Sequence, residues 1–401
     1  MSRVKEWDSW VLKSYFVFTL LFPAFYSPYT DVYLSAYYGG FSWAYLFLSL
    51  YMGIRIVKKW DQEKPWKKWL PYILLLAAYN LFSFYFNYKY LHWYWEQINN
   101  TVAFLLFPVL ILFDAGMGEG KQDNIRFLIH CIVLSNAGSI FYYILGYTNL
   151  LICNNQFIFY KLPPYYYETR HYWIYSHKSE YALMLVAFIA LFVAYRKKFK
   201  SRLSYGMSLL VLLVCLYLTH SWTGIVGVLL IFIGDILDRM DWKNFRLRRV
   251  HIFASGIFLI GSGIVAAKIF AERSVFTLGH RTEIWTAVAK VILKYPQGWG
   301  MRFGESLIQV TETRIANNAH NVFMNAALRF SIPAGICFTV LFIGIVVYSI
   351  RKSRSFLSAG MWLALLILLN MDYALMSLQM GLLFLIVYLV CFYKRKVTYV
   401  E

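Results

Sequence analysis

Apolar residues run through this chain in long stretches that are interrupted by short polar segments. A helix needs about 20 mostly apolar residues to cross a bilayer, so each such stretch predicts a transmembrane helix. The stretches lie at about 11–27, 36–57, 70–88, 98–114, 126–147, 179–195, 203–219, 222–238, 250–268, 322–350, 356–371 and 375–393. We therefore expect an all-α polytopic membrane protein of about 12 transmembrane helices, to within about two. The first stretch lacks a signal-peptide cleavage site and is expected to stay as an anchor.

Composition supports this fold class. Of the 401 residues, 60% are hydrophobic, 20% aromatic and only 15% charged, and the mean hydropathy is +0.52. Soluble domains are about 45–50% apolar and about 25% charged, so a soluble enzyme and a disordered chain are both excluded. The five cysteines are scattered singly without a CxxC motif, so neither a disulfide framework nor a metal site is indicated.

The net charge of +19 first suggests nucleic acid, but its distribution favours a membrane. With the N-terminus in the cytoplasm, roughly two thirds of the lysines and arginines fall in cytoplasmic segments, as the positive-inside rule requires. We expect residues 1–401 to form one integral domain of a bacterial cytoplasmic membrane, with both termini cytoplasmic. Its basic loops then contact anionic lipids, and no nucleic acid partner is expected.

Two long segments, 148–178 and 269–321, fall on the outer face. Loops longer than about 12–15 residues are usually functional or disordered, and neither segment is rich in Gly or Ser. We expect both to fold against the outer mouth, where any site should lie. The tyrosine-rich part of the first loop is either an interfacial aromatic belt or a set of rings that stack on a sugar. His177 and Lys178 follow it and begin the next helix.

The second loop contains a predicted helix from Arg281 to Lys294, since Trp285, Val288 and Ile292 recur at helical spacing. Pro296 ends it. Arg281 lies in the first turn, where free N–H groups favour an anion and a guanidinium can grip phosphate oxygens. The alternative is an amphipathic helix on the membrane, with Arg281 against lipid phosphates.

His320 and Asn321 stand directly before the apolar run that begins at Val322. Asn is a good helix N-cap, so His320 is expected in the first turn of a helix at its outer end. It is either a solvated interfacial residue or a proton acceptor near neutral pH.

Other candidates lie near the outer face. Ser221 and Trp222 stand in a tight turn between two apolar runs. Asp372 is the only acidic residue well inside the last two runs, and it is either functional, since intramembrane carboxylates are costly, or merely solvated. The turn from Gly298 to Gly304 contains Arg302 but matches neither a P-loop nor a dinucleotide motif.

The spaced motifs THSWTG, HRTEIW, PQGWG and NNAHNVFMNAALRFSIPAG together resemble the superfamily of O-antigen ligases and O-antigen or capsular polysaccharide polymerases. The resemblance covers roughly 177–393. Proteins of that superfamily are multi-span, GT-C-like glycosyltransferases with a long outer loop between late helices.

The resemblance implies that a glycan on undecaprenyl diphosphate is the donor and that an acceptor sugar hydroxyl attacks its anomeric carbon, without metal, nucleotide sugar or other cofactor. Arg281 matches the family arginine at the donor diphosphate, and His320 matches the histidine at the acceptor hydroxyl. The charge that develops on the diphosphate needs cationic stabilisation. Asp31 is the only acidic residue of the first outer loop, which favours arginine over a metal ion.

One departure from the family pattern is Trp222, which stands where many members carry an arginine. A second cation then has to come from Arg302, Arg314 or Lys178, or the donor binds differently. The other residues expected to bind substrate are Asn321, Trp285, Ser221, His177 and Asp372.

Three functions follow from these features. The first is a polymerase of capsule, exopolysaccharide or O-antigen that joins lipid-linked repeats, together with a chain-length regulator and a flippase of the same pathway. The alternatives are a ligase that uses another acceptor and a transporter of lipid-linked oligosaccharide. The Lys-, Ile- and Tyr-rich composition is more typical of Gram-positive cells, which have no lipopolysaccharide to ligate, so the polymerase is favoured. A transporter should carry polar groups near the bilayer midplane, whereas here they gather at the outer mouth.

Overall fold

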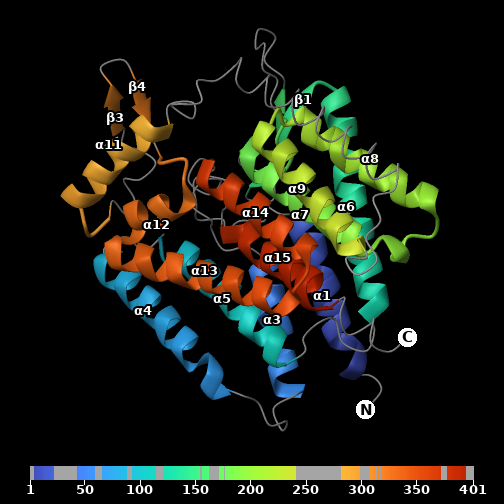
Figure 1. The fold of residues 1–401 in the computed structure, drawn as a ribbon, viewed down its shortest axis with the longest axis horizontal. Helices are drawn as coiled ribbons and strands as arrows, with labels where there is room; N and C mark the ends of the chain where they lie inside the picture. The colour runs from blue at the N-terminus through green and yellow to red at the C-terminus, as the bar shows by residue number, and fades with distance from the viewer. Residues whose placement is uncertain are drawn as a thin grey trace.

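The computed structural model describes residues 4–21, 43–58, 66–87, 93–113, 121–153, 156–161, 171–175, 177–240, 281–298, 308–311, 314–316, 318–371 and 377–393. Within these ranges the protein consists of thirteen α-helices with two small antiparallel hairpins (Figure 1). The predicted all-α class is therefore confirmed for the described part of the chain.

Every predicted apolar stretch that falls among the described residues contains a helix, whereas 250–268 lies outside them. The helices are α1 (Val4–Leu20), α3 (Trp43–Lys58), α4 (Leu70–Asn87), α5 (Trp93–Leu112), α6 (Lys121–Ile144), α7 (Lys178–Ala194), α8 (Arg202–Leu218), α9 (Trp222–Arg239), α11 (Arg281–Lys294), α12 (Val322–Phe330), α13 (Ile332–Ser353), α14 (Phe356–Met371) and α15 (Ser377–Tyr388). Short 3₁₀ turns at Trp66–Trp69 and Arg196–Lys198, and a π-helical end at Leu389–Tyr393, complete the helical part.

The prediction of one helix over 322–350 is wrong. Ser331 has φ +125°, which separates α12 from α13, and its hydroxyl accepts a hydrogen bond from Ala334 N at 3.3 Å as the N-cap of α13. Pro333 follows in the first turn of α13, where proline is tolerated because that N–H has no helical partner. The same proline would break a continuous helix.

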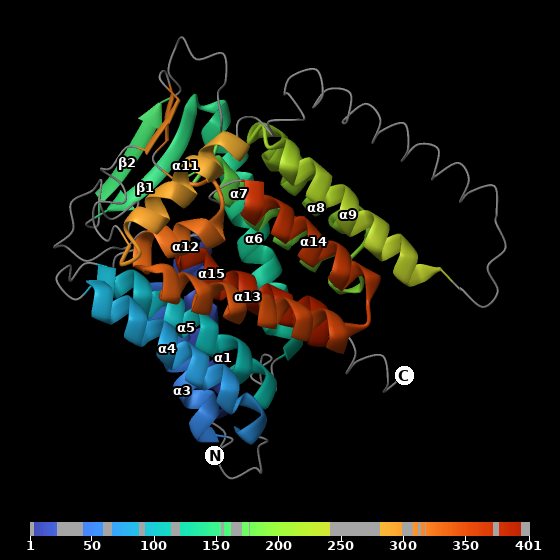
Figure 2. The same ribbon diagram turned by 60° about the vertical axis from the view of Figure 1, so that its left-hand side comes forward.

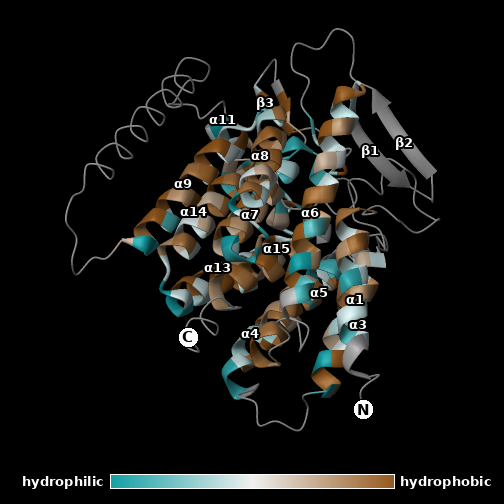
Figure 3. Ribbon diagram, turned by 90° about the vertical axis from the view of Figure 1, so that its right-hand side faces the viewer, coloured by the Kyte–Doolittle hydropathy of each residue, from teal (hydrophilic) through white to brown (hydrophobic). Residues whose placement is uncertain are grey.

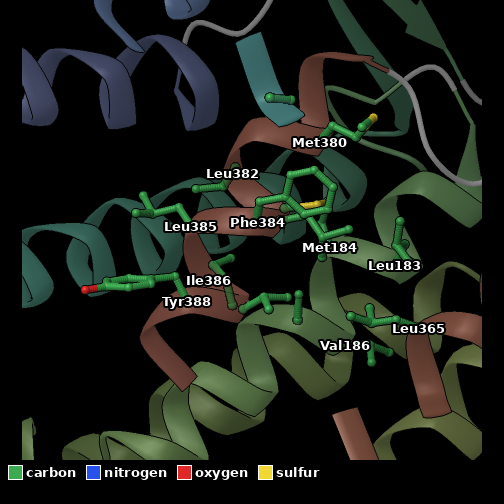
Figure 4. Close-up of a cluster of buried hydrophobic side chains, with 14 of the residues drawn as sticks. Leu183, Met184, Val186, Leu365, Met380, Leu382, Phe384, Leu385, Ile386 and Tyr388 are labelled. Atoms are coloured by element: carbon green, nitrogen blue, oxygen red, sulfur yellow. The ribbon is translucent and has the colours of Figure 1, made fainter. Parts of the chain in front are cut away.

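The central helix is α7, of which every residue from Ser179 to Ala194 is buried. A helix that is apolar all round is expected in a core. Figure 4 shows side chains of α7, among them Leu183 and Met184, against Leu365 of α14 and Phe384 of α15. These helices form the core against which the others pack.

Contacts between helix ends show how two pairs of helices run. Arg55 at the end of α3 contacts Asp8 at the start of α1 at 2.8 Å. Phe356 N at the start of α14 donates to Asp238 Oδ1 near the end of α9 at 2.7 Å. Helix α3 is therefore antiparallel to α1, and α14 is antiparallel to α9. Figure 2 shows α11 and the two hairpins close together, away from the N-terminus.

Both hairpins occur in segments that the sequence predicts only as outer loops. Strands β1 (Tyr147–Cys153) and β2 (Gln156–Lys161) form the first, and β3 (Ile308–Thr311) and β4 (Arg314–Ala316) form the second. The first had a local signal, since apolar β-formers flank two asparagines at 154–155.

Several helices expose apolar faces. On α13 the exposed residues Ile336, Val340, Ile343, Val347 and Ile350 follow helical spacing, and α4, α6 and α8 also expose several large apolar side chains. Figure 3 shows hydrophobic colour along most of α4 and α13, with hydrophilic residues at their lower ends. Among the described residues, two helices, 123–144 and 332–353, are both long and apolar enough to cross a membrane, and four apolar helices are shorter.

Candidate functional site

The predicted helix of the second loop is α11, which begins at Arg281 and ends at Lys294, two residues before Pro296. Its apolar face is buried through Ile284 and Val288 and packs against α12 and β3. The amphipathic pattern is therefore confirmed, and the apolar face of this helix covers protein.

Arg281 contacts the end of a helix that is distant in sequence. Its Nε donates a hydrogen bond to the carbonyl of Met371, the last residue of α14, at 2.8 Å. The last carbonyls of a helix lack intrahelical donors and carry the negative end of its dipole, so the guanidinium is well placed there. The N-terminus of α11 thus meets the C-terminus of α14.

Trp285 connects α11 to the segment that precedes α12. Its indole Nε1 donates to the carbonyl of Ala319 at 3.0 Å, and Ala319 N in turn donates to Oδ1 of Asn325 at 2.9 Å. The backbone immediately before His320 is therefore held from both sides.

His320 lies outside α12, two residues before its first residue, Val322, so its predicted place in the first helical turn is wrong. Asn321 is the N-cap, because its Oδ1 accepts hydrogen bonds from Phe323 N and Met324 N, both at 3.0 Å. His320 has φ +48°, and its N–H donates to Oδ1 of Asn318 at 2.8 Å. A left-handed backbone at a residue other than glycine costs energy and is often found at functional sites.

Asn321 also ties α12 to the end of α14. Its Nδ2 donates to Oδ1 of Asn370 at 3.0 Å, and Asn370 is adjacent in sequence to Met371, the partner of Arg281. The structure therefore brings Arg281, His320 and Asn321 to the same helix end. We call this group the α14-end cluster.

Two more helices begin at the end of the protein that holds the α14-end cluster. Their first residues and N-caps include Ser221, Trp222, His177 and Lys178. Helices α9 and α14 run antiparallel in close contact, since Gly234 lies against Phe356 and Gly227 against Ala364, which carries the start of α9 toward the end of α14. Ser221 Oγ accepts from Gly224 N at 3.2 Å, and His177 Nδ1 accepts from Ser179 N at 3.2 Å. Both side chains are helix N-caps, a role that the sequence had not suggested for them.

The remaining candidates cannot be placed as side chains. Arg302 and Asp372 lie outside the described residues, and of Arg314 only the backbone, in β4, is described.

The described end of the aromatic loop turns inward. His171 Nε2 lies 2.6 Å from Ser139 Oγ, and Tyr181 donates to that same oxygen at 2.9 Å. Trp173 Nε1 donates to Ser135 Oγ at 3.1 Å. Burial raises the pKa of Tyr175 well above its usual value, and the negative charge of nearby Glu180 adds to the effect. His171 and Trp173 thus anchor the described end of the loop to α6, while the tyrosines at 165–167 lie outside the described residues.

Sequence reasoning missed three polar residues near the α14-end cluster, namely the buried Asn325 and Arg329 and the half-buried Asn370. The first two had a detectable signal, because they follow Asn321 at intervals of four residues, which places them on one helix face. The third depends on how α12 packs against α14, which no local pattern reveals.

Within the described part of the chain, no three His, Cys, Asp or Glu side chains gather as a metal site would require. No protein-family model matches the chain, and no curated protein matches it.

Proposed function

We propose that this chain is a polytopic protein of the bacterial cytoplasmic membrane, with about 12 transmembrane helices and both termini in the cytoplasm. Support comes from the outward apolar stripes of α4, α6, α8 and α13, since large exposed apolar surfaces mark sites of contact with a membrane or with another protein. Arg55, near the end of α3, and Arg196, just after α7, lie at helix ends that this orientation assigns to the cytoplasm.

We further propose that the protein is a polysaccharide polymerase that joins glycan repeat units carried on undecaprenyl diphosphate, at the outer face of the membrane. One observation carries this proposal, namely that Arg281 bonds to Met371, the last residue of α14, and that Asn321, the neighbour of His320 in sequence, bonds to Asn370. A cationic group for a diphosphate and the segment that carries a basic group for a hydroxyl therefore contact the same helix end, although they are far apart in sequence.

The reaction assigns a role to each group. The acceptor hydroxyl attacks the anomeric carbon of the donor glycan, a new C–O bond forms, and the bond from that carbon to the diphosphate oxygen breaks. The hydroxyl proton passes to His320 as general base. Arg281, at the N-terminus of α11, stabilises the negative charge that develops on the leaving lipid diphosphate. A chain-length regulator and a flippase of the same pathway are the expected partners.

The test compares lipid-linked glycans, resolved by size and by membrane face, in cells that carry the wild-type protein, no protein, Arg281→Ala or His320→Ala. Lys290→Ala is the matched control, because Lys290 is an exposed cation on the same helix. We expect single undecaprenyl-linked repeats to accumulate on the outer face without polymer in the deletion and in both variants, while the control makes normal polymer.

Three other outcomes would overturn the assignment. Long chains left on the lipid in the deletion strain would mean a ligase, and single repeats trapped on the inner face would mean a transporter. Normal polymer in both variants, with membrane-inserted protein at wild-type levels, would remove Arg281 and His320 from the site.

A further inference from the structure

Three polar side chains occupy one face of α12. Asn321, Asn325 and Arg329 are spaced by four residues, so they lie in a row along the helix, and their exposed fractions are 8%, 1% and 1%. We call them the α12 row. Burying polar and charged groups is costly unless they contact groups of matching chemistry. The chemistry of the α12 row therefore indicates the kind of ligand that it binds.

The hydrogen bond that Asn325 makes within the protein shows which of its side-chain atoms is available to a ligand. Asn325 Oδ1 accepts from the backbone N–H of Ala319 at 2.9 Å. A backbone N–H can only donate, so this bond sets the orientation of the Asn325 amide. Its Nδ2 is buried and has no hydrogen-bond partner among the described residues. This nitrogen carries two N–H donors, so the missing partner is an acceptor.

Arg329 lies one helical turn beyond Asn325 on the same face. Its guanidinium carries five N–H donors and no acceptor, and its Cζ lies 5.9 Å from the ring centroid of Phe330. Side chains four residues apart on a helix have their Cβ atoms about 5–6 Å apart. One ligand can therefore reach both the Asn325 amide and the Arg329 guanidinium.

Helix α12, which carries the α12 row, is bonded to α11, which begins with Arg281. Helix α11 is held to α12 near its start by the Trp285–Ala319 bond and just after its end by the bond from Ile332 N to Pro296 O at 2.9 Å. Gly298, with φ +83°, lies so close to Arg329 that an added Cβ would be 2.7 Å from the Arg329 carbonyl. The α12 row and the α14-end cluster, joined through Asn321, therefore form one continuous polar region.

We propose that Asn325 and Arg329 bind phosphoryl oxygens, and specifically that they hold the diphosphate of the lipid-linked donor. This inference rests on the proposed function, from which the donor is taken. The chemistry is that of an oxyanion site, with buried N–H donors and a buried positive charge in a region of low dielectric, where charge-assisted hydrogen bonds are strong. The diphosphate then lies between the α12 row and Arg281.

The sharpest test is Asn325→Asp. This substitution preserves the side-chain shape and the oxygen that accepts from Ala319 N, but it replaces the N–H donors with a negative charge. If the row only supports the fold, the new carboxylate pairs with Arg329 and the unfolding temperature stays the same or rises. If the row binds an oxyanion, the carboxylate repels it and occupies Arg329.

The measurement is binding of undecaprenyl diphosphate to the full-length protein in detergent, with undecaprenol and inorganic diphosphate as separate probes. We expect Asn325→Asp to weaken binding of undecaprenyl diphosphate by about tenfold or more, with an unfolding temperature in the absence of ligand no lower than that of the wild type. Arg329→Lys, which keeps the charge but loses the planar fork, should weaken it less. Lys290→Ala should bind as the wild type does.

The outcomes separate this inference from the proposed function. Tight binding of undecaprenyl diphosphate by the wild type and by both variants would overturn the assignment of Asn325 and Arg329 to the diphosphate. The proposed function would still stand. Equal binding of undecaprenol and undecaprenyl diphosphate by the wild type would mean that the protein does not recognise the diphosphate. That result would overturn both this inference and the proposed function. Binding of inorganic diphosphate alone, lost in Asn325→Asp, would overturn the lipid-linked source. If Asn325→Asp does not fold, the same binding measurement on Arg329→Lys and the wild type tests the inference.

Discussion

The indole nitrogen of Trp285 donates a hydrogen bond to the carbonyl of Ala319 at 3.0 Å. This bond spans 34 residues of sequence and joins α11, which begins with Arg281, to the residue before His320. The positions of the two proposed functional side chains are therefore coupled through one neutral hydrogen bond.

Trp285→Phe removes this bond and retains most of the ring. We expect polymer synthesis to fall, because the backbone at His320 loses one of its two supports, while stability falls by only about 1 kcal/mol. Polymer length in cells and unfolding temperature of the purified protein check this. Thr286→Ala, at an exposed position on the same helix, should leave polymer synthesis intact. Unchanged polymer in Trp285→Phe would show that the coupling is not needed.

Gly298→Ala tests the turn that follows α11. Gly298 has φ +83°, and a Cβ there would stand 2.7 Å from the Arg329 carbonyl and 2.8 Å from Ser331 N. We expect a loss of about 1–3 kcal/mol, from the left-handed backbone and from contact with backbone atoms that cannot move away. Thermal unfolding measures the change. Gly344→Ala is the control, since Gly344 lies within α13 with nothing within 4 Å of its added Cβ; equal effects of the two substitutions would contradict the prediction.

Gly360→Ala tests the contact between α9 and α14. A Cβ at Gly360 would stand 2.5 Å from the carbonyl of Leu230, and one at Gly234 would stand 2.5 Å from the carbonyl of Phe356. Small residues allow the two helix backbones to approach closely. We expect Gly360→Ala to separate the helices and lower stability by about 1–3 kcal/mol, measured as a fall in unfolding temperature. Gly206→Ala, where α8 is exposed and nothing lies within 4 Å, should be neutral or stabilising.

Asp8→Asn tests the ion cluster at the other end of the protein. Asp8 contacts Arg55 at 2.8 Å and Lys58 at 3.3 Å, and the Asp8 and Arg55 side chains are each only 7% exposed. The substitution leaves Arg55 buried without its carboxylate partner, which typically costs about 3–5 kcal/mol, and protein yield and unfolding temperature should both fall.

The control for this prediction is Asp123→Asn. The Asp123 side chain is 75% exposed and lies 4.0 Å from Arg126, and surface pairs of this kind contribute little. Addition of Arg55→Met to Asp8→Asn should recover part of the lost stability, because it removes the buried charge. No recovery in the double variant would mean that the effect comes from packing alone.

The sequence alone determined most helices of the described part and their order, but not the division of 322–350 into α12 and α13. An uninterrupted apolar run of helix length has few other ways to bury its surface and pair its backbone, so local composition suffices. The same holds for α11, whose apolar positions recur at helical spacing and whose end at Lys294 comes two residues before Pro296. The boundary at Ser331 also has a local signal, because Pro333 fits the first turn of a helix and not its interior.

Only the tertiary structure decided which groups meet. Arg281 bonds to Met371, 90 residues away, and Asn321 bonds to Asn370, 49 residues away, and no local period encodes either contact. The order of motifs identified Arg281 and His320 as candidates, but Asn325 and Arg329 resemble ordinary polar residues in an apolar run until their burial is known. The reason is physical, because helix periodicity specifies which side chains share a face, whereas long-range packing specifies what that face contacts.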